Sequence, residues 1–164
     1  MSYNQVRRKD KQMSKEEMIE FIRTETIAHL CMIGPNNFPY VIPLNYAFVN
    51  GKFILHSAMK GLKVDCLNLD NRVCLTVSKQ HSIKTDGRIP CKEFKTPYTS
   101  IIAFGRAAMP KGEAKINYLT DFVKYNMKND SPPVTEFDKS FMLKTLVIVV
   151  DVLHMTGKSS NKEV

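Results

Sequence analysis

The residues best suited to bind a ligand or take part in a reaction lie in one segment, which runs from Leu55 to Lys63 and contains His56. An apolar strand ending at Ser57 is followed by Gly61, which permits a turn, and then by a short helix. The free backbone amides and the dipole at a helix start favour an anion, as do Lys60 and Lys63. These features are the ingredients of a phosphate site. The residues alone leave a second interpretation open, in which both lysines point into water.

Common fingerprints of other sites are missing from the sequence. No two glycines form the G-x-G pair of a dinucleotide loop, and Thr156-Gly157-Lys158 lacks the earlier glycine that a P-loop requires. The sequence also contains no G-x-S-x-G and no H-E-x-x-H, so serine hydrolase and metalloprotease chemistry have no support. The four cysteines form no C-x-x-C pair and lie at no ligand-like spacing to histidine, which argues against a structural metal site.

The net charge of +8 indicates an anionic partner. Two stretches, 1–15 and 79–95, carry most of the excess. The sequence has no Trp and no basic run interleaved with aromatic residues, so we expect no nucleic-acid partner. The N-terminus lacks a signal-peptide pattern, and the longest apolar run, 146–150, is far below the ~20 residues that span a bilayer. We therefore expect a cytoplasmic protein without a membrane partner.

Local patterns predict the secondary structure. Ser14 and Glu17 form a capping box before a short helix, and Asn50-Gly51 is typical of a tight hairpin turn. Gly105 is expected at a bulge or a close approach of two backbones. Strands are expected at 29–33, 40–48, 53–57, 73–77, 100–109 and 146–154, and further helices at 62–69, 111–127 and 137–143. The polar stretch 78–97 is expected to be a long loop.

These elements predict a mainly β protein with a single domain over residues 1–164. Six short strands, mostly joined to sequence neighbours, favour a small closed antiparallel barrel, because closure removes exposed strand edges. Residues 1–13 are expected to form a basic N-terminal arm, and residues 157–164 a flexible tail.

Several motifs follow one another in a characteristic order and spacing. They are Pro39-Tyr40-Val41-Ile42-Pro43-Leu44-Asn45-Tyr46, Leu55-His56-Ser57-Ala58 with Gly61 and Lys63, Asn71-Arg72-Val73-Cys74, Ser100-Ile101-Ile102-Ala103-Phe104-Gly105-Arg106 and Met155-Thr156-Gly157-Lys158. Together they resemble the flavin-binding split-barrel family related to pyridoxamine 5′-phosphate oxidase. Within it the sequence is most similar to the branch of 5-nitroimidazole-resistance proteins.

This resemblance implies a six-stranded antiparallel split barrel that forms a homodimer and binds FMN, with FAD as an alternative, in a cleft between subunits. It places the flavin phosphate and ribityl chain at His56, Ser57 and Lys63, beside Lys60 and Gly61. The isoalloxazine ring would lie against Pro43, Leu44, Asn45 and Tyr46. Ser100 would lie where a later strand approaches the cofactor.

The implied function is a flavin-dependent reductase that takes electrons from NAD(P)H and passes them to a nitroimidazole-type or other small acceptor. A carrier or sensor that binds flavin or haem without turnover is one alternative, and an enzyme like pyridoxamine-phosphate oxidase is another. His56 would be a flavin neighbour, a proton donor to the substrate, or a histidine at a strand end without a chemical role.

Overall fold

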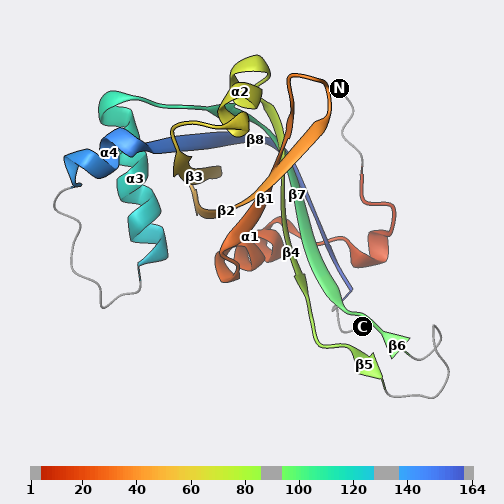
Figure 1. Ribbon diagram of the computed structural model, residues 1–164. Helices are drawn as coiled ribbons and strands as arrows, with labels where there is room; N and C mark the ends of the chain where they lie inside the picture. Colours follow the sequence, from red (N-terminus) through yellow and green to blue (C-terminus); the bar gives the residue numbers. More distant parts are fainter. Residues whose placement is uncertain (1–4, 86–93, 128–136, 161–164) are drawn as a thin grey trace.

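Six strands close into an antiparallel barrel in the order β1-β2-β3-β8-β7-β4 (Figure 1). The computed structural model describes residues 5–85, 94–127 and 137–160. The barrel strands are β1 (Ile27–Ile33), β2 (Pro39–Val49), β3 (Lys52–Ala58), β4 (Arg72–Gln80), β7 (Tyr98–Ala108) and β8 (Thr145–Ser159). The predicted six-stranded antiparallel barrel is therefore confirmed.

Helices flank the barrel on two sides and at one end (Figure 1). They are η1 (Lys9–Lys11), α1 (Lys15–Thr24), α2 (Leu62–Leu69), α3 (Gly112–Asn126) and α4 (Lys139–Lys144). Helix α1 packs Met18 and Ile22 into the barrel core, whereas α3 lies against the outer face of β2 and β3. In the part of the chain that is described, no helix is long and apolar enough to cross a membrane.

Strand alternation separates two clusters of apolar side chains. Phe53 and Leu55 point into the barrel, together with Leu30 and Ile148, and form the main core. Ile54 points the other way and packs with Leu119 of α3. Helix α3 therefore covers the apolar outer positions of β2 and β3 around Ala47 and Ile54, whereas Val41 of β2 stays exposed.

Three local predictions are confirmed in detail. The Ser14 hydroxyl accepts a hydrogen bond from the Glu17 amide while the Glu17 carboxylate accepts one from the Ser14 amide. Asn50 and Gly51 have φ values of 51° and 77°, as a tight hairpin turn requires. The register of β7 against β8 shifts between Phe104 and Gly105.

One boundary prediction is wrong. Residues 157–159 are not part of a tail, because β8 runs to Ser159 and pairs with β7 from Val149 onward. The Met13 amide also donates to the Gly157 carbonyl, so the N-terminal arm is anchored to this strand. Residues 161–164 lie outside the described part.

The stretch 78–97 is only partly a loop. Strand β4 continues to Gln80, and two short strands, β5 (Lys84–Thr85) and β6 (Phe94–Lys95), pair with one another beyond the barrel (Figure 1). Residues 86–93, which hold Arg88 and Lys92 of the basic stretch, lie outside the described residues.

Candidate functional site

The barrel is split between β2 and β3. Their ladder ends at the pair Tyr46–Leu55. Beyond this pair, β2 remains bonded to β1 as far as Pro39, and β3 remains bonded to β8 as far as Ala58. Each strand thus keeps one partner and leaves its other edge unpaired over residues 39–45 and 56–58. Backbone amides and carbonyls along such edges are available to a ligand.

A turn bearing two lysines closes one end of this split. Gly61 has φ +113°, a conformation that strains any residue with a Cβ, and it lies immediately before α2. No side chain caps the N-terminus of α2. The Lys63 ammonium donates to the Lys60 carbonyl at 2.8 Å, so it folds back over the turn. Asp65 lies in the same helical turn and forms no ion pair with either lysine.

These donors have the chemistry of a phosphate site. Uncapped amides at a helix start point outward along the axis, and Lys63 sits beside them. A Cβ added to Gly61 would make only an ordinary contact, 3.8 Å from the Lys63 nitrogen, so the positive φ and not a lack of space favours glycine here. The structure therefore brings Lys60, Gly61 and Lys63 together at the end of β3, where Ser57 lies.

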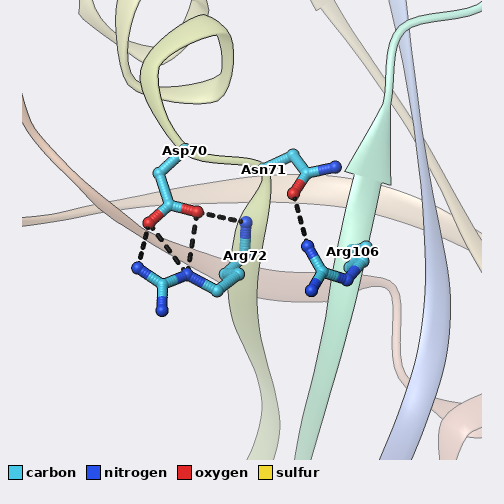
Figure 2. A network of polar contacts seen from close by, with 4 residues as sticks. All are labelled: Asp70, Asn71, Arg72 and Arg106. Atoms are coloured by element: carbon cyan, nitrogen blue, oxygen red, sulfur yellow. Dashed lines mark hydrogen bonds and ion pairs between the residues drawn. The ribbon is translucent and has the colours of Figure 1, made fainter.

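A polar network fixes the other end of α2 (Figure 2). The Asp70 carboxylate accepts hydrogen bonds from the amide and the guanidinium of Arg72, which hold the pKa of Asp70 at about 2. Arg106 on β7 donates to the Asn71 side chain at 3.0 Å. The backbone of Asn71 accepts from the Ala107 amide. Helix α2 is thus tied to β4 and β7, which sets the position of its N-terminus relative to the split.

His56 and Ser57 lie on opposite faces of β3. The His56 ring packs edge-on against Phe122 of α3, with 4.6 Å between ring centroids. Its Nδ1 is buried and has no hydrogen-bond partner among the described residues. Burial lowers the pKa of His56, so the ring is neutral at neutral pH. The two residues therefore cannot present their side chains to one group in the way that adjacency in the sequence suggests.

The four predicted ring contacts on β2 also divide between two faces. Pro43 and Asn45 are exposed on the outer face, and the Asn45 amide donates to the Thr26 carbonyl at 3.2 Å. Leu44 packs toward the barrel core. Tyr46 has no exposed surface, and its hydroxyl donates to the Ile22 carbonyl at 2.6 Å. The side chain of Tyr46 is a core residue, so the prediction that it lines a bound ring is corrected.

Replacing Tyr46 with Phe should separate a role of the hydroxyl in the core from a role in flavin binding. Loss of this buried hydrogen bond leaves the Ile22 carbonyl with the longer contact from the Tyr125 hydroxyl at 3.4 Å, so the free energy of unfolding should fall by about 1 kcal/mol. Flavin affinity should not change, because the hydroxyl points into the core. Urea unfolding and a flavin titration on the same protein measure both quantities. A weakened affinity at unchanged stability would restore Tyr46 to the binding surface.

Ser100 lies far from the phosphate turn within one chain. Ser57 pairs with Leu146, whereas Ser100 pairs with Lys158 near the other end of β8. Twelve steps of about 3.3 Å along a strand put these points roughly 40 Å apart along β8. A separation of this length along the strand argues against one copy of the chain bringing both groups to one cofactor.

Ser100 lines a groove of about 260 Å³ that the sequence did not indicate. Its other walls are Gln5, Val6, Arg7, Arg8, Ile102, Phe104, Thr156, Gly157 and Lys158. Arg8 is paired with Asp10, but neither Arg7 nor Lys158 forms an ion pair within the described chain. The Lys158 ammonium lies 5.2 Å from the ring centroid of Tyr98. The groove therefore combines an apolar floor with two uncompensated cations.

A family model matches most of the chain. The family model described as pyridoxamine 5′-phosphate oxidase matches residues 14–159. No protein with a curated description matches the chain.

Solved structures share the fold at low sequence identity. A provisionally assigned 5-nitroimidazole antibiotic resistance protein from Bacteroides thetaiotaomicron VPI-5482 is 23% identical, with a TM-score of 0.76 over 90% of this chain and 86% of that one. An FAD and haem binding protein from Mycobacterium smegmatis is 16% identical, with a TM-score of 0.79 over 93% and 74%. An FAD-binding protein from Mesorhizobium loti is 15% identical, with a TM-score of 0.64 over 92% and 96%.

Proposed function

The chain belongs to the pyridoxamine 5′-phosphate oxidase family, and from this premise we propose that it is a flavin-dependent oxidoreductase. The observation that carries the proposal is the split between β2 and β3, which ends at an uncapped helix start beside Lys63. FMN bound there would supply two-electron redox chemistry. FAD is the alternative, since two of the similar proteins are described as binding it.

Different residues of the split bind different parts of the cofactor in this proposal. Lys63, Lys60 and the first amides of α2 bind the phosphate, and Ser57 lies where the ribityl chain enters. The unpaired backbone edge of β2, over Pro43, Leu44 and Asn45, binds the polar edge of the ring. Fixed donors of this kind also favour negative charge on a bound group, because they need no reorganisation when the charge develops.

His56 belongs to the proposal as a neutral neighbour of the ring. Because burial lowers the pKa of His56, the neutral form of the imidazole is favoured at neutral pH. Its proposed role is to donate or accept one hydrogen bond and to pack against Phe122. The role of His56 as a proton donor stays a prediction, which the lowered pKa disfavours.

We further propose that each site is shared between two copies of the chain. Lys63 of one copy and Ser100 of the other then meet one flavin, because the separation of these residues along β8 argues against a site within a single copy. The outer face of the barrel supports this arrangement. Ile27 and Val41, on strands β1 and β2, are 49% and 54% exposed, and a second copy would bury them.

The groove beside Ser100 is the proposed entry for a second substrate. Arg7 and Lys158 attract a phosphorylated donor such as NAD(P)H, and the apolar floor of Ile102 and Phe104 suits a planar ring. The acceptor in this proposal is a small nitroaromatic compound, as the description of the Bacteroides relative suggests.

Stopped-flow absorbance tests the reaction. NAD(P)H should bleach the flavin spectrum of the reconstituted protein, and a nitroimidazole should restore it at a rate that depends on nitroimidazole concentration. If the bleached spectrum recovers only with oxygen, a nitro compound is not the acceptor. No bleaching with either nucleotide would indicate a carrier or sensor, and turnover of pyridoxamine 5′-phosphate would indicate an oxidase.

Mixed dimers test the shared site. Chains with Lys63→Ala and chains with Ser100→Trp should each bind flavin poorly alone. After co-refolding, a mixed dimer holds one intact site, made from Lys63 of one chain and Ser100 of the other. Binding of one flavin per mixed dimer is expected. If each site lies within one chain, every site in the mixture is defective and binding does not return.

A further inference from the structure

Two cysteines face one another across the narrowest seam of the barrel. Strands β1 and β4 share only three residue pairs, whereas β1 and β2 share seven and β4 and β7 share nine. The last of the three pairs is Cys31 opposite Cys74. Residues directly opposite in an antiparallel ladder place their side chains on the same face.

The backbone geometry suits a disulfide. Opposite Cα atoms in an antiparallel ladder lie about 4.5 or 5.5 Å apart, and disulfides bridge Cα atoms about 4.4–6.8 Å apart. The two Cβ atoms must approach by roughly 1 Å for the bond to form. A shift of this size is small for strands held together by only three pairs.

The two thiols are free and lie near one another. Both cysteines are half-buried on the outer face of the barrel. Burial raises the pKa of Cys31, which lowers its thiolate fraction and makes attack on peroxide slow. Burial, and then the neighbouring Cys31, raise the pKa of Cys74, which places the two sulfurs within electrostatic reach of one another. Cys66, by contrast, is fully buried on α2.

We propose that Cys31 and Cys74 form a reversible disulfide that locks the β1–β4 seam. Hydrogen peroxide is the oxidant. One thiolate attacks peroxide to give a sulfenic acid, and the second thiol displaces water from it. In total, two thiols and one peroxide give one disulfide and two waters, and a dithiol reductant returns both thiols by exchange. This inference does not depend on flavin binding.

The oxidant must be small. Both thiols lie on the outer face that we propose a second copy covers, and peroxide is little larger than water. The disulfide would close a chain loop that contains β2, β3 and α2, which carry the phosphate turn and the split. Closing a long loop restricts the unfolded chain, so the oxidised protein should be more stable. The redox state of the pair would thus set the rigidity of the candidate site.

Mass spectrometry of the peroxide-treated full chain tests the proposal. The intact mass should fall by two hydrogens, and digestion without reductant should yield a cross-linked peptide pair containing Cys31 and Cys74. Dithiothreitol should reverse both changes. The midpoint of thermal unfolding should rise by about 5–15 °C on oxidation. Cys31→Ser and Cys74→Ser should each abolish the cross-link and the rise, whereas Cys91→Ser should leave both intact.

Other products would overturn the proposal. They are a cross-link to Cys66 or Cys91, a disulfide between two chains, or oxygen addition at Cys31 or Cys74 without a cross-link. A Cys31→Ala variant guards against a folding defect in Cys31→Ser, and both should match the reduced protein in circular dichroism. A Cys31–Cys74 cross-link without any rise in the unfolding midpoint would contradict the locking role.

Discussion

Gly105→Ala should lower the free energy of unfolding by about 3 kcal/mol or more, the largest effect we expect from any single methyl group in this chain. A Cβ at this position would lie 2.5 Å from the Asp151 carbonyl oxygen and 2.6 Å from the Val150 side chain. The carbonyl belongs to β8 and is held in the barrel ladder, so it cannot move aside cheaply. The bulge at Phe104 and Gly105 must then open or the strands must separate.

Gly157→Ala is the matched control for this prediction. A Cβ there would meet Met18 and Met13 at 2.5–2.9 Å, but these contacts are with flexible side chains, which can rearrange. We expect a cost of about 1–2 kcal/mol. Guanidinium unfolding of both variants measures the difference. Equal costs would mean that the bulge does not constrain the closure of the barrel.

Lys63→Ala should weaken flavin binding by about 10- to 100-fold. The expectation follows from the loss of one charge-assisted hydrogen bond to a phosphate, which contributes about 1.5–3 kcal/mol. Among the described residues the Lys63 ammonium donates to the Lys60 carbonyl at the surface, so the substitution should hardly change stability. Titration with FMN, followed by the quenching of flavin fluorescence, measures the affinity.

Two controls make the Lys63 result specific. Lys124→Ala removes an exposed cation from the last turn of α3, far along the chain from the phosphate turn, and should leave affinity unchanged. Riboflavin, which lacks the phosphate, should bind the wild type and the Lys63 variant equally. A loss of riboflavin affinity as large as the loss of FMN affinity would show that Lys63 does not bind the phosphate.

Local chemistry was predictable from the sequence. The capping box at Ser14, the turn at Asn50-Gly51 and the bulge at Gly105 each depend on a few adjacent residues whose conformational preferences are strong. The turn that brings Lys60 and Lys63 together is local in the same sense. Alternation along the strands then gave six short elements and the barrel.

The second half of β8 and the groove beside Ser100 depend on pairing between distant segments, which local sequence patterns do not indicate. The second half of β8, from His154 to Ser159, mixes Thr, Gly, Lys and Ser and shows no apolar run, but β7 supplies it with a complete ladder. The groove beside Ser100 depends on that pairing, so Lys158 and Arg7 were missed.

The alternation of side chains along a strand accounts for the other differences between the predicted and the observed site. Adjacent residues of a strand point to opposite faces, and this separates His56 from Ser57. It also turns Tyr46 into the core, where α1 supplies the Ile22 carbonyl that pairs with its hydroxyl. Consecutive residues such as His56 and Ser57 therefore do not form one binding surface.

Flavin content is the most direct measure of the central claim. We expect the purified chain, incubated with FMN or FAD and freed of excess by gel filtration, to retain one flavin per chain and to show the visible absorbance bands of a bound oxidised flavin. Light scattering on the same sample should give the mass of a dimer. A folded protein that binds neither flavin saturably would contradict the assignment of the split between β2 and β3 as a flavin site.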